Sequence, residues 1–154
     1  FTPGWKCTTN ASKHCNGIHT PKQPSGHHFG SRTSDGIDKM TKTILIADDE
    51  VLLRTLLERV LKRHGYTVIA VSNGERALEV LQTETVHTVL LDVNMPGLSG
   101  LEVLEAIQRK WPQIQTILSS GDIDSVYNYD PTKRPDIYLA KPFRMKTLVD
   151  LLSV

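Results

Sequence analysis

The chain has 154 residues, of which 39% are hydrophobic and 23% are charged. That composition is typical of one globular domain with a buried core. The net charge of +1 gives no electrostatic reason to expect a nucleic acid or an anionic membrane as a partner, and no apolar stretch approaches the ~20 residues of a membrane-spanning helix.

Residues 1–39 differ in composition from the rest of the chain. They are rich in Gly, Pro, Ser, Thr and His and show neither helical nor strand periodicity. Such a segment buries too little apolar surface to offset the entropy lost on ordering. We expect a disordered leader that is not native, with Met40 as the natural start and one domain over 40–154. Both cysteines, Cys7 and Cys15, lie in this leader, and a domain without cysteines fits the reducing cytoplasm.

From residue 41 onward, short apolar runs alternate with amphipathic segments. The runs predict strands, and an apolar spacing of three and four residues predicts helices. The predicted strands are 43–47, 66–71, 86–92, 114–119 and 136–140, and the predicted helices are 51–64, 74–81, 99–111 and 144–152. Alternating strands and helices with short connections favour a parallel sheet covered on both faces. The predicted fold class is α/β, a doubly wound five-stranded parallel sheet with the flavodoxin-like order 2-1-3-4-5.

The first predicted helix carries an apolar stripe that we expect to face the core. Its members are Val51, Leu53, Leu56, Leu57, Val60 and Leu61. Gly65 follows His64 and predicts the C-terminal end of this helix.

Acidic residues follow two of the predicted strands. Asp92 ends an apolar run before a Met-Pro-Gly turn, and Asp48 and Asp49 directly follow the first strand. The predicted order makes strands one and three neighbours, so the three carboxylates should meet at the carboxyl edge of the sheet. Like charges this close raise at least one pKa unless a cation binds, and oxygen ligands favour Mg²⁺. We expect Asp49 and Asp92 to be direct ligands and Asp48 to bind directly or through water. The backbone carbonyl of Asn94 is a further expected ligand.

Two more polar residues end later strands, Ser120 the fourth and Lys141 the fifth. Taken alone, Ser120 is more simply explained as a helix cap and Lys141 as a solvated surface charge. Together with a metal and a carboxylate they are the groups that phosphoryl transfer needs, because positioning and charge neutralisation supply most of its catalysis. Asp92 is then the expected nucleophile, since the domain offers no cysteine and no serine–histidine pair.

These motifs resemble those of the bacterial two-component response-regulator receiver domain. The resemblance covers roughly residues 42–153 and rests on Asp48-Asp49, Asp92-x-Asn94-Met95-Pro96-Gly97, Ser120-Gly121 and Lys141-Pro142-Phe143. It implies that Asp92 accepts a phosphoryl group from a sensor histidine kinase or phosphotransfer protein with Mg²⁺ as cofactor. It also implies phosphoryl contacts from Ser120 and Lys141, a cis Lys141–Pro142 bond, and a switch formed by Ser120 and Tyr138.

The implied protein is a stand-alone, chemotaxis-regulator-like signalling module. It would act through a downstream protein target, with no direct contact to nucleic acid or membrane. Its only catalysis would be its own phosphorylation and dephosphorylation.

One stretch departs from the family pattern. Residues 121–135 should hold a fourth helix, but they contain Pro131 and Pro135 and show little apolar periodicity. Proline inside a helix costs about 3 kcal/mol. We therefore expect a short fourth helix of no more than two turns, or an irregular loop.

Asn94 and Asp122 lie two residues beyond Asp92 and Ser120, respectively. Both are polar and could orient a water for loss of the phosphoryl group. The sequence therefore predicts that these two residues tune dephosphorylation.

Two other functions deserve comparison. A Mg²⁺-dependent phosphohydrolase with an aspartyl-phosphate intermediate usually has a second carboxylate two residues after the nucleophile, but Asn94 occupies that position and cannot transfer a proton. A flavin-binding protein of the same fold would need a hydroxyl- and glycine-rich phosphate loop after the first strand, where Asp48 and Asp49 would repel phosphate. A bound-flavin spectrum after mixing with FMN would identify the second alternative.

Overall fold

The computed structural model describes residues 41–122, 124, 126 and 133–153. Five parallel strands form one sheet in the order β2-β1-β3-β4-β5. The strands are β1 (Thr43–Ala47), β2 (Thr67–Val71), β3 (Thr88–Asp92), β4 (Gln115–Ser120) and β5 (Ile137–Ala140), and the helices are α1 (Val51–Arg63), α2 (Gly74–Thr83), α3 (Gly100–Lys110) and α5 (Met145–Leu152). The predicted fold class and strand order are confirmed.

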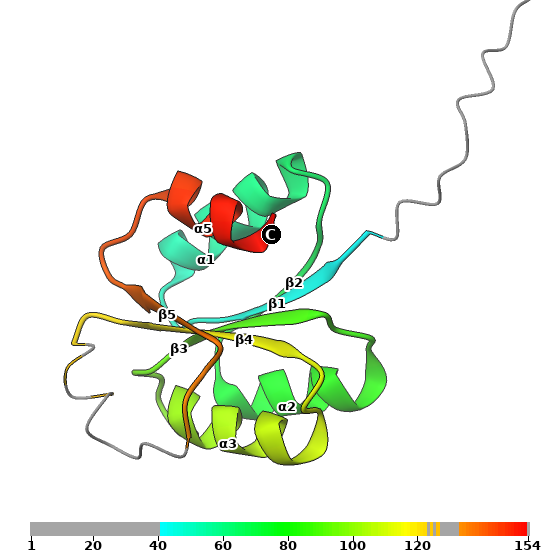
Figure 1. The fold of residues 1–154 in the computed structure, drawn as a ribbon, viewed down its shortest axis with the longest axis vertical. Coiled ribbons are helices and arrows are strands. Elements are labelled where there is room, and N and C mark those ends of the chain that lie inside the picture. The colour runs from blue at the N-terminus through cyan, green and yellow to red at the C-terminus, as the bar shows by residue number, and fades with distance from the viewer. Residues whose placement is uncertain (1–40, 123, 125, 127–132, 154) are drawn as a thin grey trace, which may run out of the picture. The chain divides into compact units, whose positions relative to one another are not determined.

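Helices cover both faces of the sheet (Figure 1). Helices α1 and α5 lie on one face and α2 and α3 on the other. Successive strand residues point to opposite faces, so Ile46 and Leu90 pack with α1 and α5, whereas Leu45 and Leu91 pack with α2 and α3. All four are nearly or fully buried. The central strands therefore contain continuous apolar runs, and the polar residues that directly follow these runs lie at the carboxyl edge of the sheet.

The apolar stripe predicted for α1 is partly wrong. Leu57 and Leu61 are buried and Leu53 is half-buried, so the inward face follows a spacing of four residues. Val51 and Leu56 are exposed instead. Each residue turns the helix by about 100°, so Leu56 lies well off the line from Leu53 through Leu57. The residues of that line, Leu53, Leu57 and Leu61, pack in the core between α1, α5 and the sheet.

Two sequence predictions fall mainly outside the described residues. The leader over 1–39 lies there entirely. Of the expected fourth helix, Asp124 and Val126 are helical, and residues 123, 125 and 127–132 are outside. Val126 is buried among the core residues on the α2–α3 side. In the part of the chain that the structure describes, no helix is long and apolar enough to cross a membrane.

Candidate functional site

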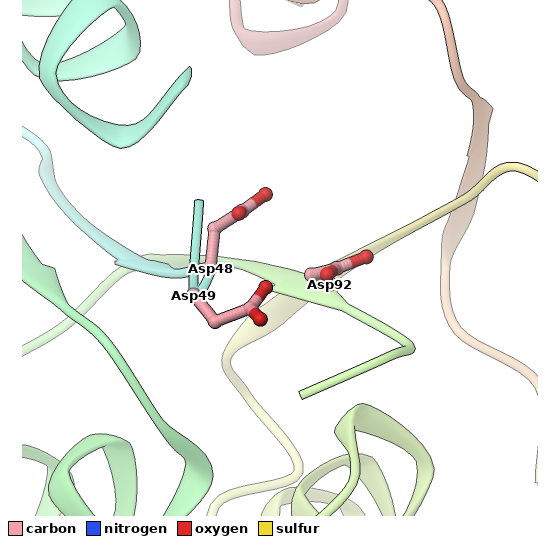
Figure 2. Close-up of side chains that lie close together, drawn as sticks. All are labelled: Asp48, Asp49 and Asp92. Atoms are coloured by element: carbon pink, nitrogen blue, oxygen red, sulfur yellow. The ribbon is translucent and has the colours of Figure 1, made fainter. Parts of the chain in front are cut away.

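Three carboxylates meet at the carboxyl edge of the sheet, as the sequence predicts (Figure 2). Asp48 and Asp49 follow β1, and Asp92 ends β3. The two strands are paired in parallel, with Ala47 opposite Leu91, so the next residue of each strand reaches the same edge. One carboxylate oxygen from each of the three residues lies within 4.8 Å of the others. These oxygens could hold a metal ion.

Burial distinguishes the three carboxylates. Asp48 and Asp92 are only 3% and 6% exposed, whereas Asp49 is exposed. Burial raises the pKa of Asp92 above its ordinary value of 3.8; the nearby Lys141 lowers it, and the charge of Asp48 raises it further. The expectation that crowding raises a pKa is thus met at Asp92, although burial contributes more than the neighbouring charge. Asp92 sits where an opposing positive charge would stabilise its ionised form.

Lys141 lies between the two buried carboxylates. Its Nζ is 2.9 Å from Asp48 Oδ2 and 3.2 Å from Asp92 Oδ1. Burial alone would lower the pKa of Lys141, but hydrogen bonding and charge from Asp48 and then Asp92 outweigh it and raise the pKa. The backbone N–H of Lys141 donates to Ser120 O at 2.7 Å, and the peptide bond to Pro142 is cis, as expected. The ammonium is therefore held at the acidic cluster by its own strand end.

Ser120 is buried at the same edge, but its hydroxyl bonds within its own turn. It donates to the backbone carbonyl of Asp122 at 3.1 Å and accepts from the Asp122 N–H at 3.0 Å. The preceding Ser119 stands opposite Asp92 in the strand register, yet its hydroxyl donates to Leu91 O at 3.1 Å inside the sheet. Ser120 is thus the last residue of β4, and its hydroxyl bonds to the turn that follows the strand, whereas the Ser119 hydroxyl bonds inside the sheet.

The remaining predicted residues lie around this edge. Asn94 and Asp122 are both exposed. Tyr138, on β5, is half-buried and packs against the core on the α2–α3 side, with Leu118 opposite it in the register. Tyr138 therefore belongs to the packed sheet and is more than a surface aromatic.

The family model of the response regulator receiver domain matches residues 44–153 of the chain. The chain belongs to this family. The match includes every strand and helix described above except the first residue of β1, Thr43, so the three carboxylates at the edge of the sheet are part of a receiver domain.

Named relatives agree with this assignment. PhoP, the alkaline phosphatase synthesis transcriptional regulatory protein of Bacillus subtilis, is 36% identical over 107 residues, covering 68% of this chain and 44% of PhoP. The response regulator FleR of Pseudomonas aeruginosa is 34% identical over 116 residues, 74% of this chain and 24% of FleR. The chain thus spans less than half the length of these relatives. The crystal structure of the response regulator TrrA of Thermotoga maritima, in complex with Mg²⁺-BeF, is 35% identical with a TM-score of 0.66, covering 73% of this chain and 97% of TrrA.

Two supporting contacts of the receiver domain were missed by sequence reasoning. The backbone N–H of Glu50 donates to Asp48 Oδ1 at 2.8 Å, and Arg54 Nη1 donates to the Asp48 carbonyl at 2.6 Å. With Lys141 on its other oxygen, the Asp48 carboxylate is held on both sides. The signal in the sequence is weak, because a basic residue in the first turn of a helix has many ordinary roles.

Proposed function

We propose that this receiver domain is a phosphorylation-controlled signalling module in which Asp92 accepts the phosphoryl group. The observation that carries the proposal is the placement of the buried Asp92 carboxylate beside the Lys141 ammonium, 3.2 Å away. The donor is a sensor histidine kinase or a phosphotransfer protein, and the response is a change in contacts with a downstream protein. We assign the relay to the cytoplasm, because the domain has no cysteine to require oxidising conditions.

We also propose that the metal is Mg²⁺. The cluster offers only oxygen ligands, and one of them, Asp49, is open to solvent. Mg²⁺ favours one or two carboxylates together with water and phosphate oxygens. Asp49 and Asp92 would bind it directly, Asp48 directly or through water, and the Asn94 carbonyl would complete the set. The ion would neutralise charge on the incoming phosphoryl group, and the Mg²⁺-BeF complex of TrrA supports this assignment.

The transfer step follows from these positions. A carboxylate oxygen of Asp92 attacks the phosphorus of a phosphohistidine; an O–P bond forms, the N–P bond breaks, and the electron pair returns to the imidazole nitrogen. Lys141 is close enough to Asp92 to donate a charge-assisted hydrogen bond to the negatively charged phosphoryl oxygens. Ser120 would contact the phosphoryl group next, and Tyr138 would move with it as the second part of the switch. Asn94 and Asp122 would flank the water that later hydrolyses the acyl phosphate.

The surface beside Asp49 supports a protein as the donor. Leu52 is 80% exposed and Val51 is also exposed at the start of α1. A cleft of about 380 Å³ lies next to them, lined by Glu50, Leu53, Lys141, Pro142 and Phe143. Exposed apolar side chains beside a reactive group are suited to docking a partner. Leu52→Asp should therefore slow labelling by a phosphorylated histidine phosphotransfer domain and leave labelling by a small phosphodonor unchanged; equal slowing of both would refute the docking role.

The acceptor is tested by intact-mass spectrometry after incubation with Mg²⁺ and a small acyl phosphate. The wild-type domain should gain one phosphoryl group, and Asp92→Asn should gain none at that site. Asp150→Asn is the matched control, because Asp150 lies on α5 in an exposed pair with Lys146, and it should be labelled like the wild type. Equal labelling of Asp92→Asn and the wild type would contradict the proposal.

A further inference from the structure

The loop after Asp92 is held closely at its base. The Val93 N–H donates to Ser119 O at 3.0 Å, and the Gly100 N–H donates to Val93 O at 3.1 Å. A Cβ added at Gly100 would lie 2.1 Å from the Asp92 carbonyl oxygen, so α3 begins directly against the backbone of the acceptor. The residues between are 94–99, and they include the Asn94 carbonyl that we assign to the metal.

The tip of the same loop is held by a different helix. The Leu98 N–H donates to Glu75 Oε1 at 3.0 Å, across 23 residues of sequence. The contact is close on both sides: a Cβ at Gly74 would lie 2.6 Å from the Leu98 carbonyl, and a Cβ at Gly97 would lie 2.7 Å from Glu75 Oε1. Gly97 also has a φ of +77°, a conformation that glycine adopts readily. Gly97 therefore makes room for the Glu75 carboxylate, and Gly74 makes room for the Leu98 backbone.

The other amides at the end of the loop have acceptors of their own. The Ser99 N–H donates to Glu102 Oε2 at 2.9 Å within the capping box of α3, and the Gly100 N–H donates to Val93 O. The Leu98 N–H depends on α2 instead. Glu75 thus supplies the hydrogen bond between the loop tip and α2, beside the packing of Met95 and Leu98 in the core.

We infer that Glu75 is a positioning residue for the phosphorylation site. By holding Gly97 and Leu98, its carboxylate limits where the segment from Asn94 onward can lie, and so fixes the Asn94 carbonyl relative to Asp92. Groups that orient metal ligands from outside the ligand set affect metal affinity strongly. The inference rests on the proposed function, since it assigns Glu75 to the Mg²⁺ site named there.

Glu75 also has an ordinary role, which the experiment must separate from positioning. It is an acidic residue in the first turn of α2, where its charge favours the helix dipole. That role depends on the charge alone. Positioning depends on an acceptor oxygen at the place of Oε1, which glutamine keeps and alanine removes. Glu75→Gln and Glu75→Ala therefore give different results only if the hydrogen bond is what matters.

The test measures Mg²⁺ affinity by titration and Leu98 amide hydrogen exchange by NMR, in the wild type, Glu75→Ala and Glu75→Gln. Glu79→Ala is the control, because Glu79 lies on the same helix and is exposed in a pair with Arg76. Glu75→Ala should weaken Mg²⁺ binding by about tenfold and expose the Leu98 amide to exchange. Glu75→Gln should stay within about threefold of the wild type, since a neutral acceptor is weaker than a charged one. Glu79→Ala should match the wild type.

Unchanged Mg²⁺ affinity in Glu75→Ala would overturn the inference, as would a glutamine variant as impaired as the alanine variant. If the wild type bound no Mg²⁺, the proposed function would fail. The hydrogen bond between Leu98 and Glu75 would then be tested by hydrogen exchange alone. A Leu98 amide that is unprotected in the wild type would refute it. Should Glu75→Ala unfold, the glutamine variant and the wild-type exchange rate would still decide.

Discussion

Lys141→Met is the sharpest test of the electrostatics of the site. The substitution keeps an unbranched side chain of similar length and removes the charge that stands between Asp48 and Asp92. Lys141 is 21% exposed, and the two carboxylates are nearly buried. Removing one partner of a buried ion pair costs about 3–5 kcal/mol. Because Lys141 lies at the rim of the sheet and is partly exposed, we expect the low end, about 3 kcal/mol, or a fall in Tm of about 12 °C.

The pH dependence of this loss follows from the pKa shifts. The raised pKa of Lys141 means that its contribution to stability is complete below 10.5 and is lost only as pH rises through the folded-state value. At neutral pH, the substitution Lys141→Met therefore removes the whole contribution of Lys141 to stability. In the variant, the pKa of Asp92 should rise further, because the charge and the hydrogen bond of Lys141, which both lower it, are gone. As pH falls, Asp92 in the folded variant takes up a proton, and this offsets part of the lost stability. The difference in free energy of unfolding between the variant and the wild type should therefore shrink in mildly acidic buffer.

Mg²⁺ should rescue the variant. The metal and the ammonium neutralise the same carboxylates, so the wild type must bind Mg²⁺ against the charge of Lys141 whereas the variant need not. The rise in Tm on adding Mg²⁺, followed by circular dichroism, should be larger in Lys141→Met. Lys146→Met is the control: its pair with Asp150 is exposed, and such pairs contribute about 0.5 kcal/mol. A smaller Mg²⁺ effect in Lys141→Met than in the wild type would refute this account of the site.

Three further results are expected. Asp49→Ala should abolish the Mg²⁺-induced rise in Tm, which in the wild type reflects about 2.7 kcal/mol at a hundredfold excess over Kd; an unchanged rise would count against Asp49 as a ligand. The Kd for Mg²⁺ should increase as pH falls, beginning above the ordinary carboxyl value of 3.8 because the pKa of Asp92 is raised, and a Kd that stays constant into mildly acidic buffer would contradict this. The phosphoryl group on Asp92 should decay in seconds to minutes, and replacing both Asn94 and Asp122 with leucine should lengthen its half-life about tenfold, equal to about 1.4 kcal/mol in the barrier. An unchanged half-life would show that these two side chains do not orient the water.

The strand ends were predictable from the sequence because of a simple geometric rule. Parallel strands finish at one edge, so the first polar residues after buried apolar runs must gather there. That rule is sufficient to bring Asp48, Asp49, Asp92 and Lys141 together without any knowledge of side-chain contacts. It does not give their individual environments: Asp48 is buried and Asp49 exposed, although they are adjacent in the sequence.

Other features could not be read from spacing. Leu56 has the same residue type as Leu57, and only the direction in which α1 meets the sheet leaves one exposed and the other buried. The bond between Glu75 and Leu98 depends on the path of a loop and on two glycines 23 residues apart. An acidic residue near a helix start is common for reasons of the helix dipole, so the sequence gives no reason to assign Glu75 to the site.

Ser120 connects the site to the rest of the receiver domain. Its hydroxyl both donates to and accepts from the Asp122 backbone, so donating to a phosphoryl group on Asp92 would require it to leave the Asp122 carbonyl. Phosphorylation should therefore shift the Asp122 amide resonance, because the hydroxyl that accepts from that N–H would turn its proton to another partner. In Ser120→Ala the hydroxyl is missing in both states, and the phosphorylation-dependent part of the shift should be lost. Ser119→Ala is the matched control, since its hydroxyl bonds to Leu91 inside the sheet. An Asp122 amide that shifts equally in Ser120→Ala would show that the signal reaches this turn by another route.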